Sequence, residues 1–376
     1  MEHTVKFQHI VLVIIASCSH NPDLKENDLT IKKDTLVSTG KPNWKSFFKK
    51  SPSVKDISSM KQNMATWLNS SQMQNLKKAA RAQVILGQYE KAIQSYRTLI
   101  RNNPKETQLI IELAQVFLRK DKIDRCFATL REAKSNIDNN EQPKSDIIFQ
   151  YKYTLGLTYI RKGNDTMGHS ILSSLISKDP GFSPAYAAMS SSYLAKNKLQ
   201  LSEFIAKRGL DRGKEDASLT NLLGVIAYRR GKYVEAKRWL KRSLKKNENF
   251  VPAIINRANI HIYNGELEAA EASLNKAIML KPDSSEAYTV LGIVYRKQKR
   301  YKESESALLK SLELRPESAY SRYNLALLKY ESLEEPGEAL RLFHEVIQID
   351  SSNSKLTEQA RLSIETLKDG GRKGVF

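Results

Sequence analysis

The side chains that could carry catalysis or bind a metal are few and scattered along the 376 residues. The two cysteines, Cys18 and Cys126, are too few for a disulfide framework, and no cysteine–histidine spacing matches a zinc site. The histidines are His3, His9, His20, His169, His261 and His344. No pair of them has the i, i+4 spacing of a helical zinc protease, and no phosphate loop, dinucleotide fingerprint or nucleophile elbow occurs. We therefore expect no catalytic residue, no metal ligand and no cofactor, and we do not expect an enzyme.

Cys18 directly follows a short apolar segment. The run over residues 10–16 is far shorter than the roughly 20 residues that cross a bilayer as a helix, but it fits the apolar core of an export signal. The residues Ile15-Ala16-Ser17-Cys18 that end it resemble a bacterial lipobox. This resemblance implies that residues 1–17 are a lipoprotein signal peptide and that Cys18 carries acyl chains such as palmitate. The alternative is an incidental cysteine in a buried strand.

The same resemblance implies a location. Ser19 follows the cysteine where an aspartate would retain a Gram-negative lipoprotein in the inner membrane, so sorting to the outer membrane is permitted. We expect a lipid-anchored protein of the bacterial cell envelope, on the periplasmic face of the outer membrane. Residues 18–56 are polar and show no sustained period, which is typical of a lipid anchor followed by a flexible tether. The sequence leaves the organism and the membrane leaflet open.

The chain is strongly basic. It contains 61 Lys and Arg against 41 Asp and Glu, a formal net charge of +20. Such a balance favours acidic partners, which include proteins, anionic lipid, cell-wall polymers and nucleic acid. Because an exported chain would not meet cytoplasmic nucleic acid, we expect protein or peptide partners of acidic character.

A 34-residue period runs through the chain. Glycine or a polar substitute marks it at Gly163, Asn197, Gly231, Gly265 and Lys299. Gly87 and Asp121 are also 34 residues apart and join the frame through an eight-residue insertion. An eighth unit fits only with one extra residue near Glu334. A fixed period of this length is the signature of a repeat protein.

Small residues recur within each unit where two helices would cross closely. They are Ala92, Cys126, Gly168, Ser202, Ala236, Ala270 and Ser304. Larger residues such as Leu240 and Leu308 are expected to fill the gap to the next unit, because no unit can bury its apolar face alone. Cys126 occupies a small-residue position, so we interpret it as a buried packing thiol without a redox role.

The pattern resembles the tetratricopeptide repeat. Two of the fullest matches are Leu223-Gly224 with Gly231-Lys232-Tyr233, and Leu291-Gly292 with Tyr295 and Tyr301. The resemblance implies an all-α fold, a right-handed superhelical α-solenoid of helix-turn-helix units. We expect a leading amphipathic helix over residues 57–72, about eight repeats over residues 73–352, and a capping helix and tail over residues 353–376.

The expected capping helix has its own apolar spacing. Leu356, Ala360, Ile364 and Leu367 follow a helical period, and Gly370-Gly371 are expected to end the helix.

The resemblance implies a partner groove lined by the first helix of each unit. The expected groove residues are Tyr153, Arg161, Asn221, Tyr228, Arg229, Asn259, Tyr263, Arg296, Lys297 and Tyr323. Tyr provides contact area, Asn pairs with peptide backbone, and Arg forks onto carboxylates. The alternative is that these side chains are solvated or packed against neighbouring helices. The two-repeat Lys/Asn clamp of chaperone-binding relatives is absent.

A basic stripe marks the second helix of the fifth unit. Its six cations, at i, i+1, i+4, i+5, i+8 and i+9, are Lys237, Arg238, Lys241, Arg242, Lys245 and Lys246. This spacing places them on one helix face. The stripe is either a binding surface or an ordinary solvated face.

Together these features predict a membrane-anchored interaction scaffold of the cell envelope. The resemblance extends to two groups of repeat lipoproteins, the pilotins that assist pilus or secretion assembly and the adaptors that organise peptidoglycan enzymes. The alternative is a charge-driven binder of an anionic polymer. The sequence leaves the partner, the process and the oligomeric state open.

Overall fold

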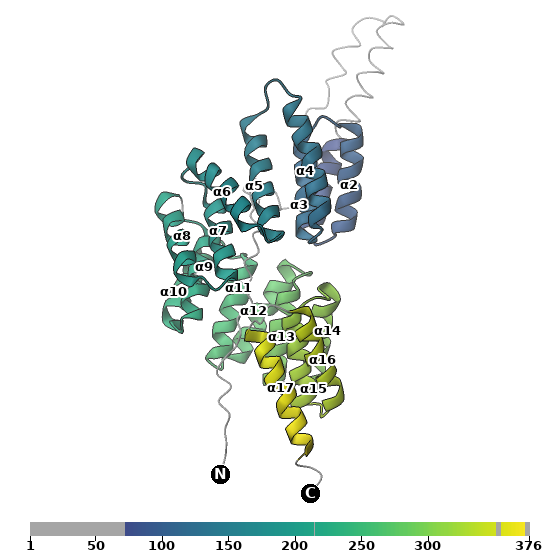
Figure 1. Ribbon diagram of the computed structural model, residues 1–376, viewed down its shortest axis with the longest axis vertical. Coiled ribbons are helices and arrows are strands. Elements are labelled where there is room, and N and C mark those ends of the chain that lie inside the picture. The colour runs from purple at the N-terminus through teal and green to yellow at the C-terminus, as the bar shows by residue number, and fades with distance from the viewer. Residues whose placement is uncertain (1–71, 214, 351–354, 373–376) are drawn as a thin grey trace, which may run out of the picture. The chain divides into compact units, whose positions relative to one another are not determined.

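The computed structural model describes residues 72–213, 215–350 and 355–372 (Figure 1). The expected signal peptide, Cys18, the tether and nearly all of the expected leading helix lie outside these residues. The expected end of the repeats, at residue 352, also lies outside them. The domain boundaries drawn from the sequence therefore stay predictions.

Every element in the described residues is a helix, and the predicted all-α fold is confirmed. Residues 72–85 form the first described helix. The amino-terminal elements that follow are α2 (Tyr89–Asn102), α3 (Thr107–Arg119), α4 (Ile123–Asp138) and α5 (Ser145–Arg161). The later ones are α6 (Asp165–Lys178), α7 (Ser183–Ala195), α8 (Leu199–Arg212), α9 (Ala217–Arg229), α10 (Tyr233–Lys246), α11 (Val251–Tyr263), α12 (Leu267–Leu280), α13 (Ser285–Lys297), α14 (Tyr301–Leu314), α15 (Ala319–Glu331), α16 (Pro336–Ile349) and α17 (Lys355–Arg372).

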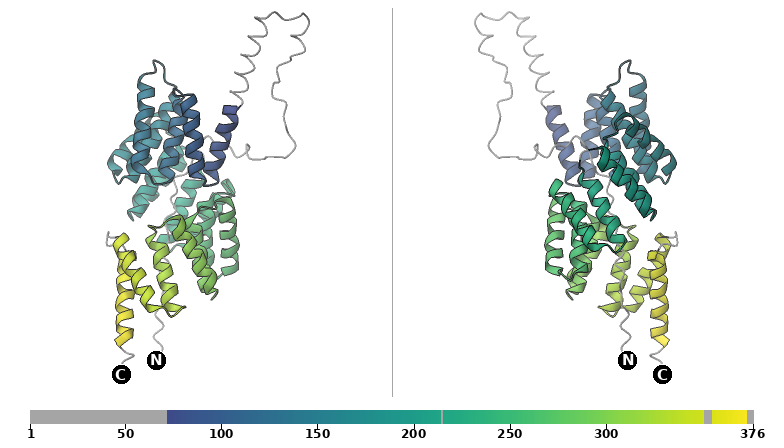
Figure 2. Two further views of the ribbon diagram at one scale, coloured as in Figure 1. Left: turned by 90° about the vertical axis from the view of Figure 1, so that its right-hand side faces the viewer. Right: turned by 90° about the vertical axis from the view of Figure 1, so that its left-hand side faces the viewer.

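The helices form two compact units that meet in sequence at Gly163 and Asn164. In the amino-terminal unit, α3 packs against α2, α4 and α5. In the carboxy-terminal unit, each helix from α6 to α17 packs against its neighbour in sequence. The first helices of successive pairs also contact one another there, α7 with α9, α9 with α11, α11 with α13 and α13 with α15. Figure 2 shows these pairs from two further sides.

The turn inside each pair sits where the 34-residue frame places it. Gly87, Asp121, Gly163, Asn197, Gly231, Gly265 and Lys299 all have positive φ, between 57° and 87°. At Gly231 the next residue, Lys232, donates its backbone N–H to the Ala227 carbonyl at 2.9 Å. This six-residue bond is the mark of a Schellman motif, in which a left-handed residue ends the helix. Glycine adopts that conformation without the steric cost that a side chain brings.

The eighth turn is one residue wider. Glu334 takes the positive φ of 54°, and Glu335 donates to the Lys329 carbonyl at 2.8 Å, six residues back along the chain. The extra residue expected near Glu334 is therefore absorbed in the turn.

Small residues allow the two helices of a pair to approach closely. A Cβ added at Gly224 would lie 2.9 Å from Leu240 Cγ, and one added at Gly292 would lie 2.6 Å from Leu308 Cγ. Where serine replaces glycine, it forms hydrogen bonds across the contact. The Ser190 hydroxyl donates to the Ser202 carbonyl at 2.9 Å, and the Ser202 hydroxyl donates to the Ser190 carbonyl at 2.7 Å. These contacts fix the distance between the two helices.

The last helix closes the stack. α17 packs against α15 and α16, with Ala360 and Ile364 at 0% and 6% exposure. The apolar spacing that predicted this helix is confirmed. Its expected end is wrong, because α17 runs through Gly370-Gly371 to Arg372. A helical glycine costs only about 1 kcal/mol relative to alanine, which does not by itself end a helix.

We predict that Gly292→Ala lowers the free energy of unfolding by up to about 2 kcal/mol. Overpacking against Leu308 costs about 1–3 kcal/mol, and the gain in helix propensity offsets roughly 1 kcal/mol of it. Urea unfolding followed by circular dichroism measures the difference. Gly337→Ala is the matched control: its added Cβ meets nothing within 4 Å, so its stability should stay the same or rise. Equal stability of the two variants would contradict the packing role.

Candidate functional site

The expected groove residues lie on first helices in both units. Tyr153 and Arg161 belong to α5 of the amino-terminal unit. The other eight belong to α9, α11, α13 and α15 of the carboxy-terminal unit.

Half of these residues are buried between helices. They are Tyr153, Asn221, Tyr228, Asn259 and Tyr323, each 8% exposed or less. Asn221 accepts a hydrogen bond from Asn256 Nδ2 at 2.9 Å, which joins α9 to α11. Burial favours the packing role that the sequence left open for these five side chains.

Two of the three groove arginines bind a neighbouring first helix. Arg229 Nη1 donates to the Leu194 carbonyl at 2.9 Å and so satisfies the carboxyl end of α7. Burial lowers the pKa of Arg229. Arg296 pairs with Glu331 on the next first helix. Both guanidinium groups therefore connect adjacent units of the stack.

Three tyrosines form an aromatic cluster at the meeting of α9, α10 and α11. Tyr233 stacks on Tyr263 with ring centroids 3.8 Å apart, and Tyr228 meets Tyr233 edge-on at 5.2 Å. Burial, with the neighbouring phenols Tyr233 and Tyr263 adding to it, raises the pKa of Tyr228. Tyr263 stays 49% exposed. The sequence did not identify Tyr233 as a member of this cluster. The ring on which it stacks, Tyr263, belongs to the following unit and lies 30 residues later in the chain.

The remaining groove residues are exposed. Arg161 Nη1 lies 3.9 Å from Asp121 Oδ1 within the amino-terminal unit. Lys297 is the last residue of α13. Tyr263, Lys297 and Arg161 are thus the accessible members of the expected groove, and their role in binding stays a prediction.

The basic stripe of α10 is fully on the surface. All six of its cations are exposed, whereas Ala236, Leu240 and Ser243 on the opposite face are buried. Arg242 pairs with Glu215 and lies 5.3 Å from the Trp239 ring. Within the described part of the chain, the other five cations form no ion pair.

Unpaired cations on one helix face repel each other. Like charges at i, i+4 cost a few tenths of a kcal/mol per pair. Lys245 and Lys246 regain part of that cost because they sit in the last turn, where the helix dipole favours positive charge. The stripe therefore concentrates positive charge on one face of α10, while the other face of the helix is packed against the protein.

Two exposed apolar side chains lie at outward positions of α8 and α10, and the sequence alone did not single them out. Val234 is 70% exposed and stands three and four residues before Lys237 and Arg238, on the same face of α10. Phe204 of α8, 59% exposed, occupies the position one 34-residue unit before Arg238. The repeat frame could have identified both, because they fall at outward positions of second helices.

Cys126 is the buried packing residue that the sequence predicts. It is 0% exposed and lies 3.2 Å from the Thr158 hydroxyl. Burial raises the pKa of its thiol to about 11. Among the residues that the structure describes, no cluster of His, Cys, Asp and Glu could hold a metal ion, and no helix is both long and apolar enough to cross a membrane.

A buried carboxylate in the amino-terminal unit also escaped sequence analysis. Glu112 is 4% exposed in the middle of α3. A single acidic residue between Ile111 and Leu113 was the available signal, because a buried charge requires partners.

Comparison with known proteins agrees with this geometry. Tetratricopeptide-repeat family models match residues 76–106 and 255–319. These two segments therefore carry tetratricopeptide repeats, in agreement with the residue pattern.

Relatives share the repeat over different lengths. The anaphase-promoting complex subunit CDC16 of Saccharomyces cerevisiae is 25% identical over 56% of this chain and 24% of its own. The protein O-mannosyl-transferase TMTC3 of Homo sapiens is 37% identical over 25% of this chain and 10% of its own. The TPR repeat-containing protein YpiA of Bacillus subtilis is 22% identical over 72% of this chain and 62% of its own.

One similar solved structure is the crystal structure of the APC/C hetero-tetramer Cut9-Hcn1. The match has a TM-score of 0.57 at 16% identity and covers 78% of this chain and 55% of that one. This likeness concerns the fold. The chain spans less than two thirds of the length of each of these proteins.

Proposed function

We propose that the chain is an interaction scaffold that recruits an acidic protein partner through α10. One observation carries the proposal: five exposed cations on a packed helix lack any ion pair with the described residues. In a merely solvated face, such cations would gain by pairing with nearby acids, as Lys329 does with Glu305 and Glu335.

The surroundings of the stripe favour a protein over a polymer. Protein interfaces combine arginine and apolar anchors, and Val234 provides exposed apolar surface on the same face of α10 as the first cations. The stripe spans ten residues from Lys237 to Lys246, or about 14 Å of helix between the first and last Cα. An acidic helix or strand of similar length would match its charge along one face.

An anionic polymer is the alternative. Binding to such a polymer depends on charge and falls steeply with salt. On duplex DNA, the logarithm of the binding constant falls against the logarithm of the salt concentration with a slope near −0.9 for each phosphate neutralised. Apolar contacts at Val234 would make a protein complex less sensitive to salt.

Photo-crosslinking from Val234 distinguishes these partners. Benzoylphenylalanine at position 234 leaves every cation in place, and the same residue at position 302 of α14 is the matched control, two 34-residue units away. We predict light-dependent protein adducts from position 234 and none from position 302 in cells that make the full chain. Adducts sensitive only to nuclease or to glycan-cleaving enzymes would support the polymer instead. Equal adducts from both positions would contradict a specific surface.

We further propose that Cys18 anchors the scaffold to a membrane of the bacterial envelope. The support is Ile15-Ala16-Ser17-Cys18 after a short apolar run. Stable anchoring requires more than one acyl chain or a second membrane signal, and a triacylated cysteine would meet that need. A tethered scaffold suits the assembly of a pilus or secretion complex, or the organisation of peptidoglycan enzymes, on the periplasmic face of the outer membrane.

Cys18→Ala tests the anchor. The variant should lose incorporation of labelled palmitate and move from the detergent phase to the aqueous phase in detergent partitioning, because acyl chains supply its membrane affinity. Cys126→Ala is the control, since Cys126 is buried, and it should keep both properties. Full labelling of Cys18→Ala would show that Cys18 is not the acylated residue.

A further inference from the structure

The exposed face of α8 carries apolar and then basic side chains. Four of them stand at i, i+3, i+7 and i+11, which places them along one side of the helix: Leu201, Phe204, Arg208 and Arg212. Leu201 and Phe204 are 39% and 59% exposed, and both arginines are exposed as well. Among the residues that the structure describes, neither arginine forms an ion pair, and neither does Asp211 between them. This face is therefore apolar in its first half and basic in its second.

Two ion pairs connect α8 with α10, and α9 packs against both helices. Just before α10 begins, Arg230 Nη1 bonds Glu203 in the first half of α8. Farther along α10, Arg242 of the stripe bonds Glu215, three residues after α8 ends. In both pairs the two partners are 27 residues apart, so α8 and α10 keep the same register at both places. The two helices therefore run side by side in the carboxy-terminal unit (Figure 1).

The repeat frame places matching positions of α8 and α10 on the same side of the stack. Arg208 stands one 34-residue unit before Arg242, and Arg212 stands one unit before Lys246, so exposed cations recur at both positions. Val234, 70% exposed, begins the outward face of α10 with an apolar side chain, and the cations follow it. Both helices thus present apolar surface near the amino-terminal end and positive charge toward the carboxyl-terminal end.

The chemistry of this surface limits what it can bind. A second copy of the chain would bring cations against cations, because each copy has a net charge of +20. A uniformly charged polymer would leave the apolar side chains in water. Single exposed apolar residues are ordinary, but here Leu201, Phe204 and Val234 lie on two neighbouring helices beside exposed cations. A protein segment that carries both apolar and acidic side chains complements them.

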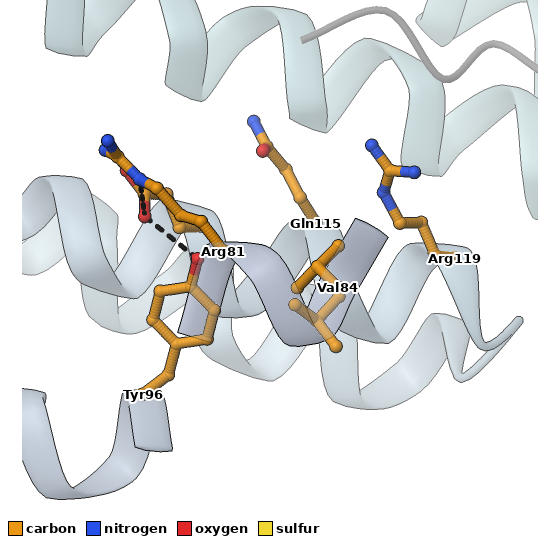
Figure 3. A pocket seen from close by; sticks show the side chains of 7 residues that line it. Arg81, Val84, Tyr96, Gln115 and Arg119 are labelled. Carbon is orange, nitrogen blue, oxygen red and sulfur yellow. Dashed lines mark hydrogen bonds and ion pairs between the residues drawn. The ribbon is translucent and has the colours of Figure 1, made fainter. Parts of the chain in front are cut away.

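The pocket of the amino-terminal unit is not a competing site (Figure 3). Arg81 Nη2 donates to the Glu112 carboxylate at 2.5 Å, and Tyr96 Oη donates to the same carboxylate at 3.0 Å. The polar side chains of the pocket wall therefore satisfy one another. The free space of about 20 Å³ has room for about one water molecule. The open faces of α8 and α10 are the larger surface.

We propose that the acidic partner of α10 also crosses α8, where an apolar side chain of the same segment packs on Leu201 and Phe204 while its carboxylates face the cations. This inference rests on the proposed function of α10 and defines the segment that binds there. Phe204 and Arg212 are eight residues apart, or about 12 Å along the helix. The segment therefore carries its apolar anchor about eight residues from its acids if it is helical, and about four if it is extended.

Crosslinking from the apolar pair of α8 tests the proposal. Benzoylphenylalanine in place of Phe204 keeps an aromatic side chain there. The same residue in place of Leu309, an exposed leucine of α14, is the matched control. In cells that make the full chain, we expect one protein to be captured from positions 204 and 234 and none from position 309. Tandem mass spectrometry of the adducts should place both crosslinks in one acidic segment of that protein.

Removing the anchor measures its contribution. In the chain with the crosslinker at position 234, Phe204→Ser should lower the yield of protein adduct about tenfold, because a few apolar anchors carry most of the binding energy of an interface. Leu309→Ser removes an exposed apolar side chain elsewhere and should leave the yield unchanged. Circular dichroism of the two variants checks that they fold alike.

The outcomes separate this inference from the proposed function. Full yield from position 234 in Phe204→Ser would overturn the role of α8 and leave the partner of α10 in place. Capture of different proteins from positions 204 and 234, or of a second copy of this chain or lipid from position 204, would do the same. Absence of protein adducts from position 234 would instead overturn the proposed function, and this inference with it.

Discussion

The close crossing of the two helices in each pair is the constraint on which the rest of the structure depends. Gly224 and Gly292 leave no room for a Cβ beside Leu240 and Leu308. Each leucine packs on the glycine of its own pair. It also joins an apolar cluster with residues of the following pair. Each unit then supplies the apolar surface that its neighbour needs, and the stack gains its core one pair at a time.

This layering decides which faces are free for partners. First helices such as α9, α11 and α13 contact one another as well as their own second helices. Polar side chains on them, including Asn221 and Asn259, consequently become buried between neighbours. Second helices are packed on one side, so the outward face of α10 can display a continuous row of cations. The continuous row of six exposed cations lies on a second helix for this physical reason.

The sequence predicted the fold in detail because the same residue types recur at the same positions in successive repeats. The 34-residue recurrence of the turn residues, the small residues at the crossings and the apolar face of α17 followed from residue spacing together with the resemblance to the repeat family. The end of α17 did not, since two glycines lower helix stability without forcing a stop. The burial of Tyr228 and Tyr323 also did not follow, because it depends on side chains of other helices, Tyr233 and Phe343.

The account rests on the charge of α10 acting on a partner while the fold stays intact. The most direct measurement is the yield of protein adduct from the crosslinker at position 234 after Lys241→Glu and Lys245→Glu together. Lys91→Glu with Lys302→Glu changes the net charge by the same amount on other helices. The account predicts that the first pair lowers the yield about tenfold or more, because like charges would then face the acidic partner. It predicts that the second pair leaves the yield unchanged, with equal circular dichroism for both. Equal yields from the two double variants would contradict it.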